Sequence, residues 1–154
     1  MKIIQKFSLT AEQKEGVRAL WNQEYPEKLR HNNLSDLENY LQNLEDQEHF
    51  LLTDAEGKLS GWAFTFSRED ERWFAIILGN NIHGLGFGRS LLNKLKEKDP
   101  KLNGWVIDHD SNQKRNGQFY KSPLDFYLKN NFEVIQDTRL ETDNISAVKI
   151  EWVK

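Results

Sequence analysis

Four segments of the chain repeat apolar residues every three or four positions, the spacing of an amphipathic helix. Thr10 with Gln13, and Ser35 with Glu38, have the spacing of a capping box, and Ser122-Pro123 suits an N-cap followed by a first helical position. The sequence therefore predicts four helices. Their apolar faces are Val17, Leu20 and Trp21; Leu37, Tyr40, Leu41 and Leu44; Phe87, Leu91, Leu92 and Leu95; and Leu124, Tyr127 and Leu128.

Between these helices, apolar runs and period-two alternation predict seven strands. They lie at 1–7, 49–53, 59–66, 73–78, 103–109, 132–135 and 147–153. The strands at 73–78 and 103–109 are separated by one helix, which predicts a parallel pair with a right-handed crossover. The remaining strands have the spacing of hairpins. We expect an α/β fold with a mixed sheet of about seven strands, four helices on its faces, and one domain over 1–154.

Composition narrows the class of protein. A length of 154 residues suits one domain, and the five Trp can fill its core although hydrophobic residues are only 38% of the chain. The net charge of −3 argues against a nucleic-acid partner. The absence of Cys excludes disulfides, thiolate metal sites and a Cys nucleophile. No signal-peptide pattern or membrane-span pattern is seen, so we expect a cytoplasmic protein without a membrane partner.

The most informative segment follows the buried run at 73–78. It reads His83-Gly84-Leu85-Gly86-Phe87-Gly88-Arg89-Ser90 and opens the third predicted helix. A strand, a glycine-rich turn and a helix N-terminus in this order form an anion site, because unpaired N–H groups and the positive end of the helix dipole face the same point. Glycine also allows positive φ and the close approach of a ligand.

Two nucleotide-binding patterns fit this segment poorly. A dinucleotide fingerprint would need glycine where Arg89 stands, because Gly88 comes one residue too early. Gly79 and Gly84 have the spacing of a phosphate loop, but Leu85 occupies the place of its lysine. A simple tight turn between strand and helix is a further alternative.

His83 to Gly88 resembles the R/Q-x-x-G-x-G/A motif of the GNAT superfamily of N-acetyltransferases. Phe126-Tyr127-Leu128-Lys129-Asn130-Asn131-Phe132 is similar to that family's F-Y-x-K-x-G-F segment, and the predicted element order also matches. The chain departs from the family pattern at three positions. His83 replaces Arg or Gln, Asn131 replaces the helix-ending Gly, and Tyr120 stands where Asn is frequent.

The resemblance implies acetyl-CoA as cosubstrate and direct transfer of its acetyl group to a primary amine of a small-molecule or peptide acceptor. It implies that Ile76 and Leu78 offer backbone groups to pantetheine, and that Tyr127 contacts the sulfur and acts as the acid for the thiolate. The residues expected around the pyrophosphate are His83, Gly84, Leu85, Gly86, Phe87, Gly88, Arg89 and Ser90. A non-catalytic acyl-CoA-binding protein of the same fold is the main alternative, and a nucleotide-binding regulatory domain is another.

The general base is less defined, because the run at 73–78 contains no Asp, Glu or His. Asp108 and His109 follow the next strand, where a ligand crevice is expected. Histidine as a residue type titrates near neutral pH, so His109 is the candidate base, while Asp108 or Asp110 could bind an ammonium group. A solvated turn or a water chain are the alternatives. We expect no metal site here, because adjacent residues of a strand point to opposite faces.

Other polar and aromatic features have simpler interpretations. The loop at 111–121 is long and lies between two expected site elements, so we expect it to shape the acceptor pocket. Trp62, Trp73 and Trp105 suit the core, although one could form the floor of that pocket. The charged segment at 68–72 is expected to be a solvated turn, and His31 and His49 to be structural or solvated. Oligomeric state stays open, with a homodimer as one option.

Overall fold

The computed structural model describes all 154 residues, and its elements follow the predicted order. The helices are α1 (Ala11–Glu24), α2 (Leu34–Gln42), α3 (Phe87–Lys98) and α4 (Leu124–Lys129), with short 3-10 turns η1 (Glu27–Leu29) and η2 (Asn80–Ile82). The strands are β1 (Lys2–Lys6), β2 (Glu45–Thr53), β3 (Leu59–Arg68), β4 (Glu71–Leu78), β5 (Lys101–Ile107), β6 (Glu133–Glu141) and β7 (Ser146–Val153). None of the helices combines the length and the apolarity that a bilayer crossing requires.

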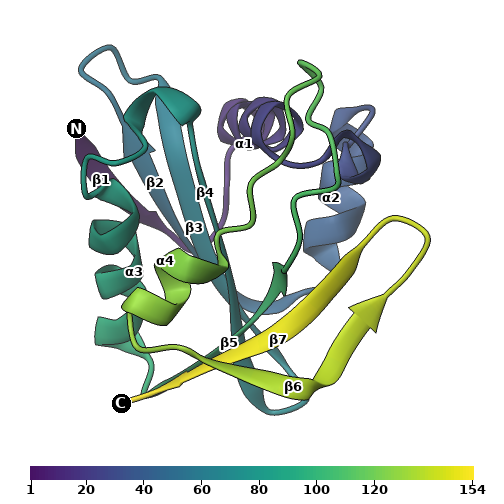
Figure 1. Ribbon diagram of the computed structural model, residues 1–154. Coiled ribbons are helices and arrows are strands. Elements are labelled where there is room, and N and C mark those ends of the chain that lie inside the picture. The colour runs from purple at the N-terminus through teal and green to yellow at the C-terminus, as the bar shows by residue number, and fades with distance from the viewer.

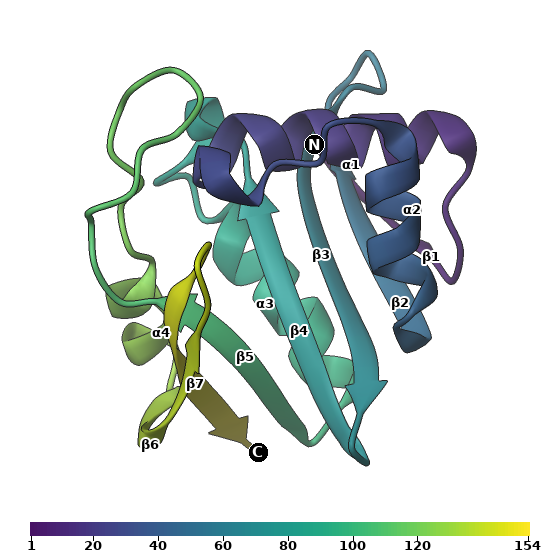
Figure 2. The ribbon, with the colours of Figure 1, turned by 90° about the vertical axis from the view of Figure 1, so that its right-hand side faces the viewer.

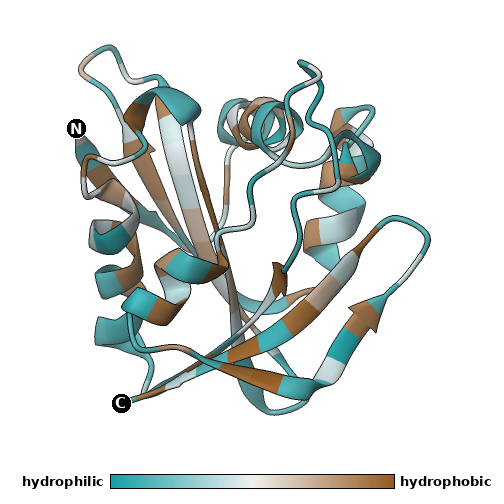
Figure 3. Cartoon of the chain, viewed as in Figure 1, coloured by the Kyte–Doolittle hydropathy of each residue, from teal (hydrophilic) through white to brown (hydrophobic).

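All seven strands form one mixed sheet in the order β1-β2-β3-β4-β5-β7-β6. Its single parallel pair is β4 with β5, as the sequence predicts, and α3 makes the crossover between them. Helices α3 and α4 cover one face of the sheet, and α1 and α2 cover the other (Figure 1). Hydrophobic residues concentrate along the central strands, whereas the long loop before α4 is mostly hydrophilic (Figure 3).

Alternation along the strands divides the core into two clusters, one on each face. In β4, Phe74 packs with α3 and α4 residues such as Leu91 and Tyr127, whereas Trp73 packs with α1 and α2 residues such as Val17 and Leu37. Period-two alternation in the middle of the sheet therefore decides which helices each strand residue meets.

Pairing between β4 and β5 is limited to one position, Trp73 with Asn103. Beyond it the two strands part, and Figure 2 shows them spreading toward the ends that carry the glycine turn and the long loop. On the other side of β5 the ladder with β7 is complete from Lys101 to Ile107. The sheet is therefore opened at its centre, between β4 and β5, and its other interruptions are register shifts in the β2–β3 and β6–β7 pairs.

Several local expectations are corrected. The N-cap of α2 is Asn33, whose side chain accepts from Asp36 N–H, so the expected capping box of Ser35 with Glu38 is wrong. The N-cap residue of α4 is Pro123 rather than Ser122, although the Ser122 hydroxyl still accepts from Leu124 N–H. The capping box of Thr10 with Gln13 is confirmed.

The charged segment at 68–72 is only partly a solvated turn. Glu69 and Asp70, both with positive φ, make the turn itself. Arg68 ends β3, while Glu71 and Arg72 begin β4 and form ion pairs with Lys101 and Asp99 at 3.0 and 3.5 Å. The β3–β4 pairing thus includes Glu71 and Arg72, the two residues before the apolar run at 73–78. The expectation of a wholly solvated segment is therefore wrong.

His49 is a structural residue of the core, with only 1% of its surface exposed. Its Nδ1 accepts from Trp62 Nε1–H at 3.0 Å, and its Nε2 lies 2.9 Å from Gln47 Oε1. Both contacts suit a neutral ring with the hydrogen on Nε2, because a proton on Nδ1 would face another donor. Burial lowers the pKa of His49 from 6.5 to about 4.

This lowered pKa sets a pH dependence of stability. Between pH 6.5 and about 4 the unfolded chain binds a proton at His49 that the folded protein does not, so the free energy of unfolding falls as the pH falls. We expect a loss on the order of 3 kcal/mol across this window, measured by urea denaturation. His49→Gln keeps an acceptor for Trp62 and cannot titrate, so it should flatten the curve. An equal slope in the variant would contradict this account.

Candidate functional site

A cavity of about 410 Å³ lies where β4 and β5 part. Its walls come from both faces of the sheet, so it passes through the opening between the two strands. Phe74, Ile76, Val106 and Tyr127 belong to the cluster on the α3/α4 face, and Trp73 and Trp105 to the cluster on the α1/α2 face. Two molecules could therefore meet in this cavity from opposite faces of the sheet.

On the edge of β4 that faces this opening, the backbone N–H and C=O groups are not hydrogen-bonded to β3. Gly79 N–H donates to Ser60 O at 2.8 Å, across the β3 side of the ladder. Successive residues of a strand direct their backbone groups to opposite sides, so Leu78 and Ile76 direct theirs toward β5. Since β5 is not paired there, an extended ligand could bond to them as an added strand would.

The glycine turn lies at the end of this edge, and each glycine has its own structural reason. Gly84 and Gly86 have φ of 77° and 87°, and Gly86 is the N-cap of α3. A Cβ on Gly88 would lie 3.2 Å from both Leu78 Cδ1 and Phe126 Cζ, so this glycine lets α3 pack closely. Turn geometry alone therefore accounts for the three glycines, and the anion site needs independent support.

That support comes from the hydrogen bonds of the turn. None of the backbone N–H groups from Gly84 to Arg89 has an acceptor within the protein, and α3 has no side-chain N-cap. Arg89 stands in the first helical turn without an ion-pair partner, a position where the helix dipole disfavours a cation. A row of free N–H groups beside an unpaired Arg has the chemistry of a phosphate site.

His83 and Ser90 close the turn from within. His83 Nε2 lies 3.0 Å from Leu78 O, so the ring donates to the last carbonyl of β4. Ser90 Oγ donates to Gly86 O at 3.1 Å. Leu78 therefore keeps only its N–H for a ligand along β4. Leu85 and Phe87 contribute their backbone N–H groups to the turn, and the Leu85 side chain is exposed.

Tyr127 enters the cavity from α4 on the α3/α4 face. Its ring packs edge-on against Phe74 and Phe132, with centroids 5.6 and 5.4 Å away, and only 6% of the residue is exposed. The helix that carries it is fixed at its end, because Lys96 Nζ of α3 donates to Asn130 O at 2.7 Å and Asn131 adopts a positive φ of 71°. Tyr127 is thus held rigidly, while its hydroxyl makes no hydrogen bond in the protein.

The cavity contains all four tyrosines of the chain, Tyr25, Tyr40, Tyr120 and Tyr127. Burial raises the pKa of each above its ordinary value of 10, to about 12 for Tyr40. Their charges would also repel one another, which raises the pKa of Tyr25 and Tyr127 further. All four phenols are therefore neutral at physiological pH and can act as donors.

Asp108 and His109 lie beyond the end of β5, and neither lines the cavity. The Asp108 carboxylate is held by Arg139, with Nη1 and Nη2 at 2.8 and 3.0 Å, and this guanidinium lowers the pKa of Asp108. His109 Nδ1 accepts from Ser111 N–H at 3.2 Å. Neither residue therefore provides a free proton acceptor within the cavity, although both directly follow Ile107, which lines it.

The long loop and the end of α1 form a wall of the cavity on the α1/α2 side. In Figure 1 the loop rises from β5 toward α1 before it returns to α4. Glu27 N–H donates to Gln113 O at 2.9 Å, and Tyr120 packs edge-on against Tyr25 at 6.1 Å. Only 6% of Glu24 is exposed, and its carboxylate joins this wall to the segment before the glycine turn, accepting from Asn80 N–H at 2.9 Å and pairing with Lys114 at 3.4 Å.

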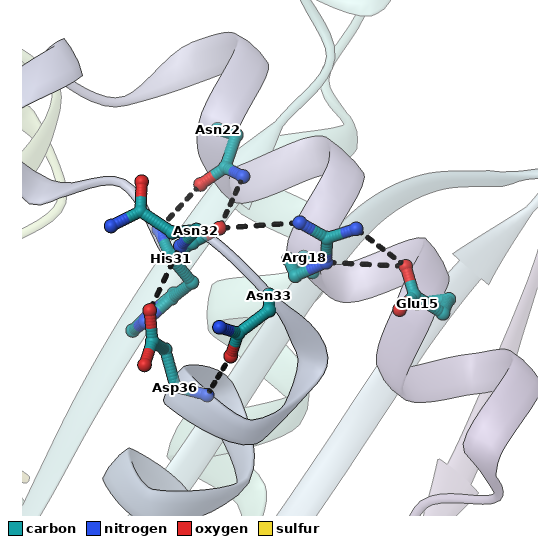
Figure 4. Close-up of polar contacts among 7 residues, drawn as sticks. All are labelled: Glu15, Arg18, Asn22, His31, Asn32, Asn33 and Asp36. Atoms are coloured by element: carbon teal, nitrogen blue, oxygen red, sulfur yellow. Dashed lines mark hydrogen bonds and ion pairs between the residues drawn. The ribbon is translucent and has the colours of Figure 1, made fainter.

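Polar contacts fix the connection between α1 and α2 (Figure 4). The Asn22 side chain clasps the His31 backbone, accepting from its N–H and donating to its carbonyl, both at 2.9 Å. Arg18 adds a bond to the same carbonyl at 3.3 Å. The η1 turn, which brings Leu29 into the cavity, is therefore held in place from both ends.

Among the lining residues with a hydroxyl or a charge, Tyr25, Tyr40 and Arg68 were not expected from the sequence. Trp73 and Trp105 do line the cavity, whereas Trp62 is fully buried in the core. Tyr25 and Tyr40 come from α1 and α2, far from the motifs, and Arg68 is part of a charged run. No local pattern in the sequence relates these three residues to one another.

A spectrophotometric titration can test the burial of the four phenols. We expect no phenolate absorbance from the folded protein near pH 10, because burial raises every tyrosine pKa. The urea-unfolded chain should titrate all four near pH 10 and serves as the internal control. Ionisation of any tyrosine near pH 10 before unfolding would contradict the cavity as described.

Comparison with known proteins identifies the fold. No family model matches the chain, and no curated protein matches it in sequence. A crystal structure of an aminoglycoside 6'-N-acetyltransferase complexed with coenzyme A superposes with a TM-score of 0.74 at 12% identity, covering 99% of this chain and 97% of that one. A GNAT superfamily phosphinothricin acetyltransferase from Sinorhizobium meliloti, in complex with AcCoA, gives 0.69 at 10% identity, covering 99% and 89%.

A variant of spermidine N-acetyltransferase from Vibrio cholerae gives a TM-score of 0.64 at 15% identity, covering 99% of this chain and 95% of that one. Each likeness extends over nearly the whole length of both chains. The chain therefore has the fold of the GNAT superfamily of N-acetyltransferases, with its seven-stranded mixed sheet and central parallel pair.

Proposed function

We propose that this protein is an acetyl-CoA-dependent N-acetyltransferase that acts on a primary amine. One observation carries the proposal: the row of free N–H groups at Gly84 to Arg89 adjoins the open edge of β4, which leads into a cavity through the sheet. A diphosphate joined to a long flexible arm fits this arrangement. The neighbours of the same fold that are complexed with coenzyme A or AcCoA support it.

In this proposal the cosubstrate is held by backbone more than by side chains. The N–H groups from Gly84 to Arg89 and the Arg89 guanidinium bind the pyrophosphate. Ile76 and the N–H of Leu78 bond the pantetheine arm along β4. His83 holds the turn against the strand, because its ring already donates to Leu78 O. His83, where Arg or Gln is usual in the family motif, thus has a positioning role.

The acetyl group is transferred directly. The acceptor nitrogen bonds to the thioester carbonyl carbon, a backbone N–H of the open β4 edge stabilises the oxyanion, and the C–S bond then breaks. The departing sulfur takes a proton from the Tyr127 phenol, which is protonated at physiological pH and whose pKa burial raises further. The nitrogen returns its surplus proton to the phenolate, so the products are the amide and the thiol.

An ammonium acceptor must lose one proton before it attacks. The cavity walls contain no carboxylate and no imidazole. Asp108 is paired with Arg139, and His109 would have to give up its bond to Ser111 N–H before its Nδ1 could accept. We propose that this proton leaves through water at the mouth of the cavity, with His109, two residues beyond the cavity-lining Ile107, as the candidate side chain to accept it from the water.

A non-catalytic acyl-CoA-binding protein is the second candidate, favoured by the absence of a base from the cavity walls. Acetyl transfer to amines separates the two, because a binding protein would take up acetyl-CoA and release no CoA thiol.

Binding of the cosubstrate tests the glycine turn. Acetyl-CoA should raise the melting temperature, and ATP or NAD should not. Gly86→Ala places a Cβ at φ of 87° and should displace the N–H row, weakening acetyl-CoA binding at least about tenfold in calorimetry. Gly57→Ala is the matched control, because Gly57 has φ of 82° and equally open surroundings in the β2–β3 turn. If both variants bind like the wild type, the turn is not the site.

Substitution of Tyr127 by Phe tests the acid. We expect kcat to fall by about 100-fold or more, with acetyl-CoA affinity nearly unchanged, because only the proton donor is removed. The free energy of unfolding should not fall, since the hydroxyl makes no hydrogen bond in the protein, and urea denaturation checks this. Undiminished turnover would rule out Tyr127 as the acid.

A further inference from the structure

The α1/α2 half of the cavity has aromatic walls and one charged residue. Tyr40, Phe66, Trp73 and Trp105 form these walls, and the only ionic side chain that lines the cavity is Arg68. Arg68 is exposed and therefore stands where the cavity meets solvent. An acceptor that enters from this side passes a cation and meets no anion.

The Arg68 guanidinium is held by aromatic rings and has no ionic partner. Its central carbon lies 5.1 Å from the centroid of Phe66 and 5.7 Å from that of Trp73. It forms no ion pair, although Glu69 and Asp70 follow it directly, whereas the nearby Lys101 and Lys149 both pair with Glu71 at 3.0 and 3.6 Å. Arg68 is therefore a positioned cation whose hydrogen-bond donors are free for a ligand.

This arrangement disfavours an acceptor with a second positive charge. A cation could bind without a carboxylate only on the aromatic faces. Trp73 already has two cations over its ring, Arg68 and, at 5.4 Å, Lys149. The same arrangement favours an anionic group, which a planar guanidinium can bind with two hydrogen bonds.

The distance between Arg68 and the opening in the sheet sets the length of such an acceptor. The guanidinium lies over Trp73, and Ile76, which lines the cavity and directs its backbone groups toward the opening, is three residues further along β4. At 3.3 Å per residue this separation is about 10 Å. Flat aromatic walls line the interval between the two points.

We propose that the acceptor is an amine with a flat apolar body that carries a carboxylate about 10 Å from its nitrogen, and that Arg68 binds this carboxylate. The proposal rests on the N-acetyltransferase function and names the class of its substrate. Arg68 is a specificity residue here, because it contacts the end of the acceptor that does not react.

A set of matched amines tests the proposal. Para-(aminoethyl)benzoate carries the carboxylate, para-(aminoethyl)benzamide has the same shape without the charge, phenethylamine lacks the group, and spermidine is a polycation. We expect kcat/KM for the benzoate to exceed that for the benzamide at least about tenfold, and spermidine to be the poorest acceptor. The preference should weaken as ionic strength rises.

Variants of Arg68 assign this preference to the side chain. Arg68→Gln should bring the benzoate and the benzamide to similar kcat/KM through a higher KM for the benzoate, and Arg68→Lys should restore part of the difference. Lys58→Gln, which removes a cation from the β2–β3 turn, is the charge-matched control and should keep the wild-type preference. Arg68 ends an exposed hairpin, so these variants should fold, and urea denaturation checks that they do.

Failure of the two proposals can be told apart. If spermidine or the benzamide is acetylated as well as the benzoate, the acceptor class is wrong and the N-acetyltransferase function stands. If no amine is acetylated although acetyl-CoA binds, the function is wrong. Calorimetric titration of the benzoate and the benzamide into the CoA-bound protein then decides the role of Arg68, because equal binding of the two would overturn it.

Discussion

The parting of β4 and β5 after one paired position is the constraint on which the site depends. An opened ladder leaves backbone groups without partners, and this costs stability wherever they are buried. Side chains satisfy the two ends of the opening. Asn103 Nδ2 donates to Arg72 O at 3.1 Å where the strands part, and His83 donates to Leu78 O at the far end. Only the middle of the β4 edge is left open to a ligand.

Close packing keeps the opening in place. Gly104 follows Asn103, the residue of β5 that pairs with β4, and a Cβ there would lie 2.8 Å from the Phe74 ring. The ring thus occupies the space beside β5 on the α3/α4 face, where Tyr127 and Phe132 support it. The complete ladder of β5 with β7 holds the other edge of β5. A wedge of aromatic side chains and a rigid outer strand together separate the two halves of the sheet.

The sequence predicts the architecture well, because local periodicity and connection lengths determine it. The order of elements, the parallel pair, the glycine turn and the positive φ of Asn131 all follow from patterns within short segments. The caps of α2 and α4 were placed one or two residues away, since several neighbouring polar residues could serve. The glycine turn needed the structure for its decisive feature, the row of N–H groups without acceptors.

The acceptor half of the site could not be predicted in the same way. Arg139, which pairs with Asp108, lies 31 residues away in the sequence. The Arg68 guanidinium is positioned by aromatic rings from two different strands. Such convergence depends on the tertiary fold and leaves no local pattern. The absence of acidic residues from the cavity walls is likewise a property of the assembled surface.

Glu24 gives the two halves of the site a common anchor. Its carboxylate accepts from Asn80 N–H, just before the glycine turn, and pairs with Lys114 in the loop that walls the opposite side. One buried group therefore contacts both the segment before the turn and the loop. By thermodynamic linkage, any effect of one ligand on the affinity of the other must be reciprocal and equal. Glu24 thus links the donor and acceptor sides of the site through the frame of the protein, separately from the residues that touch either molecule.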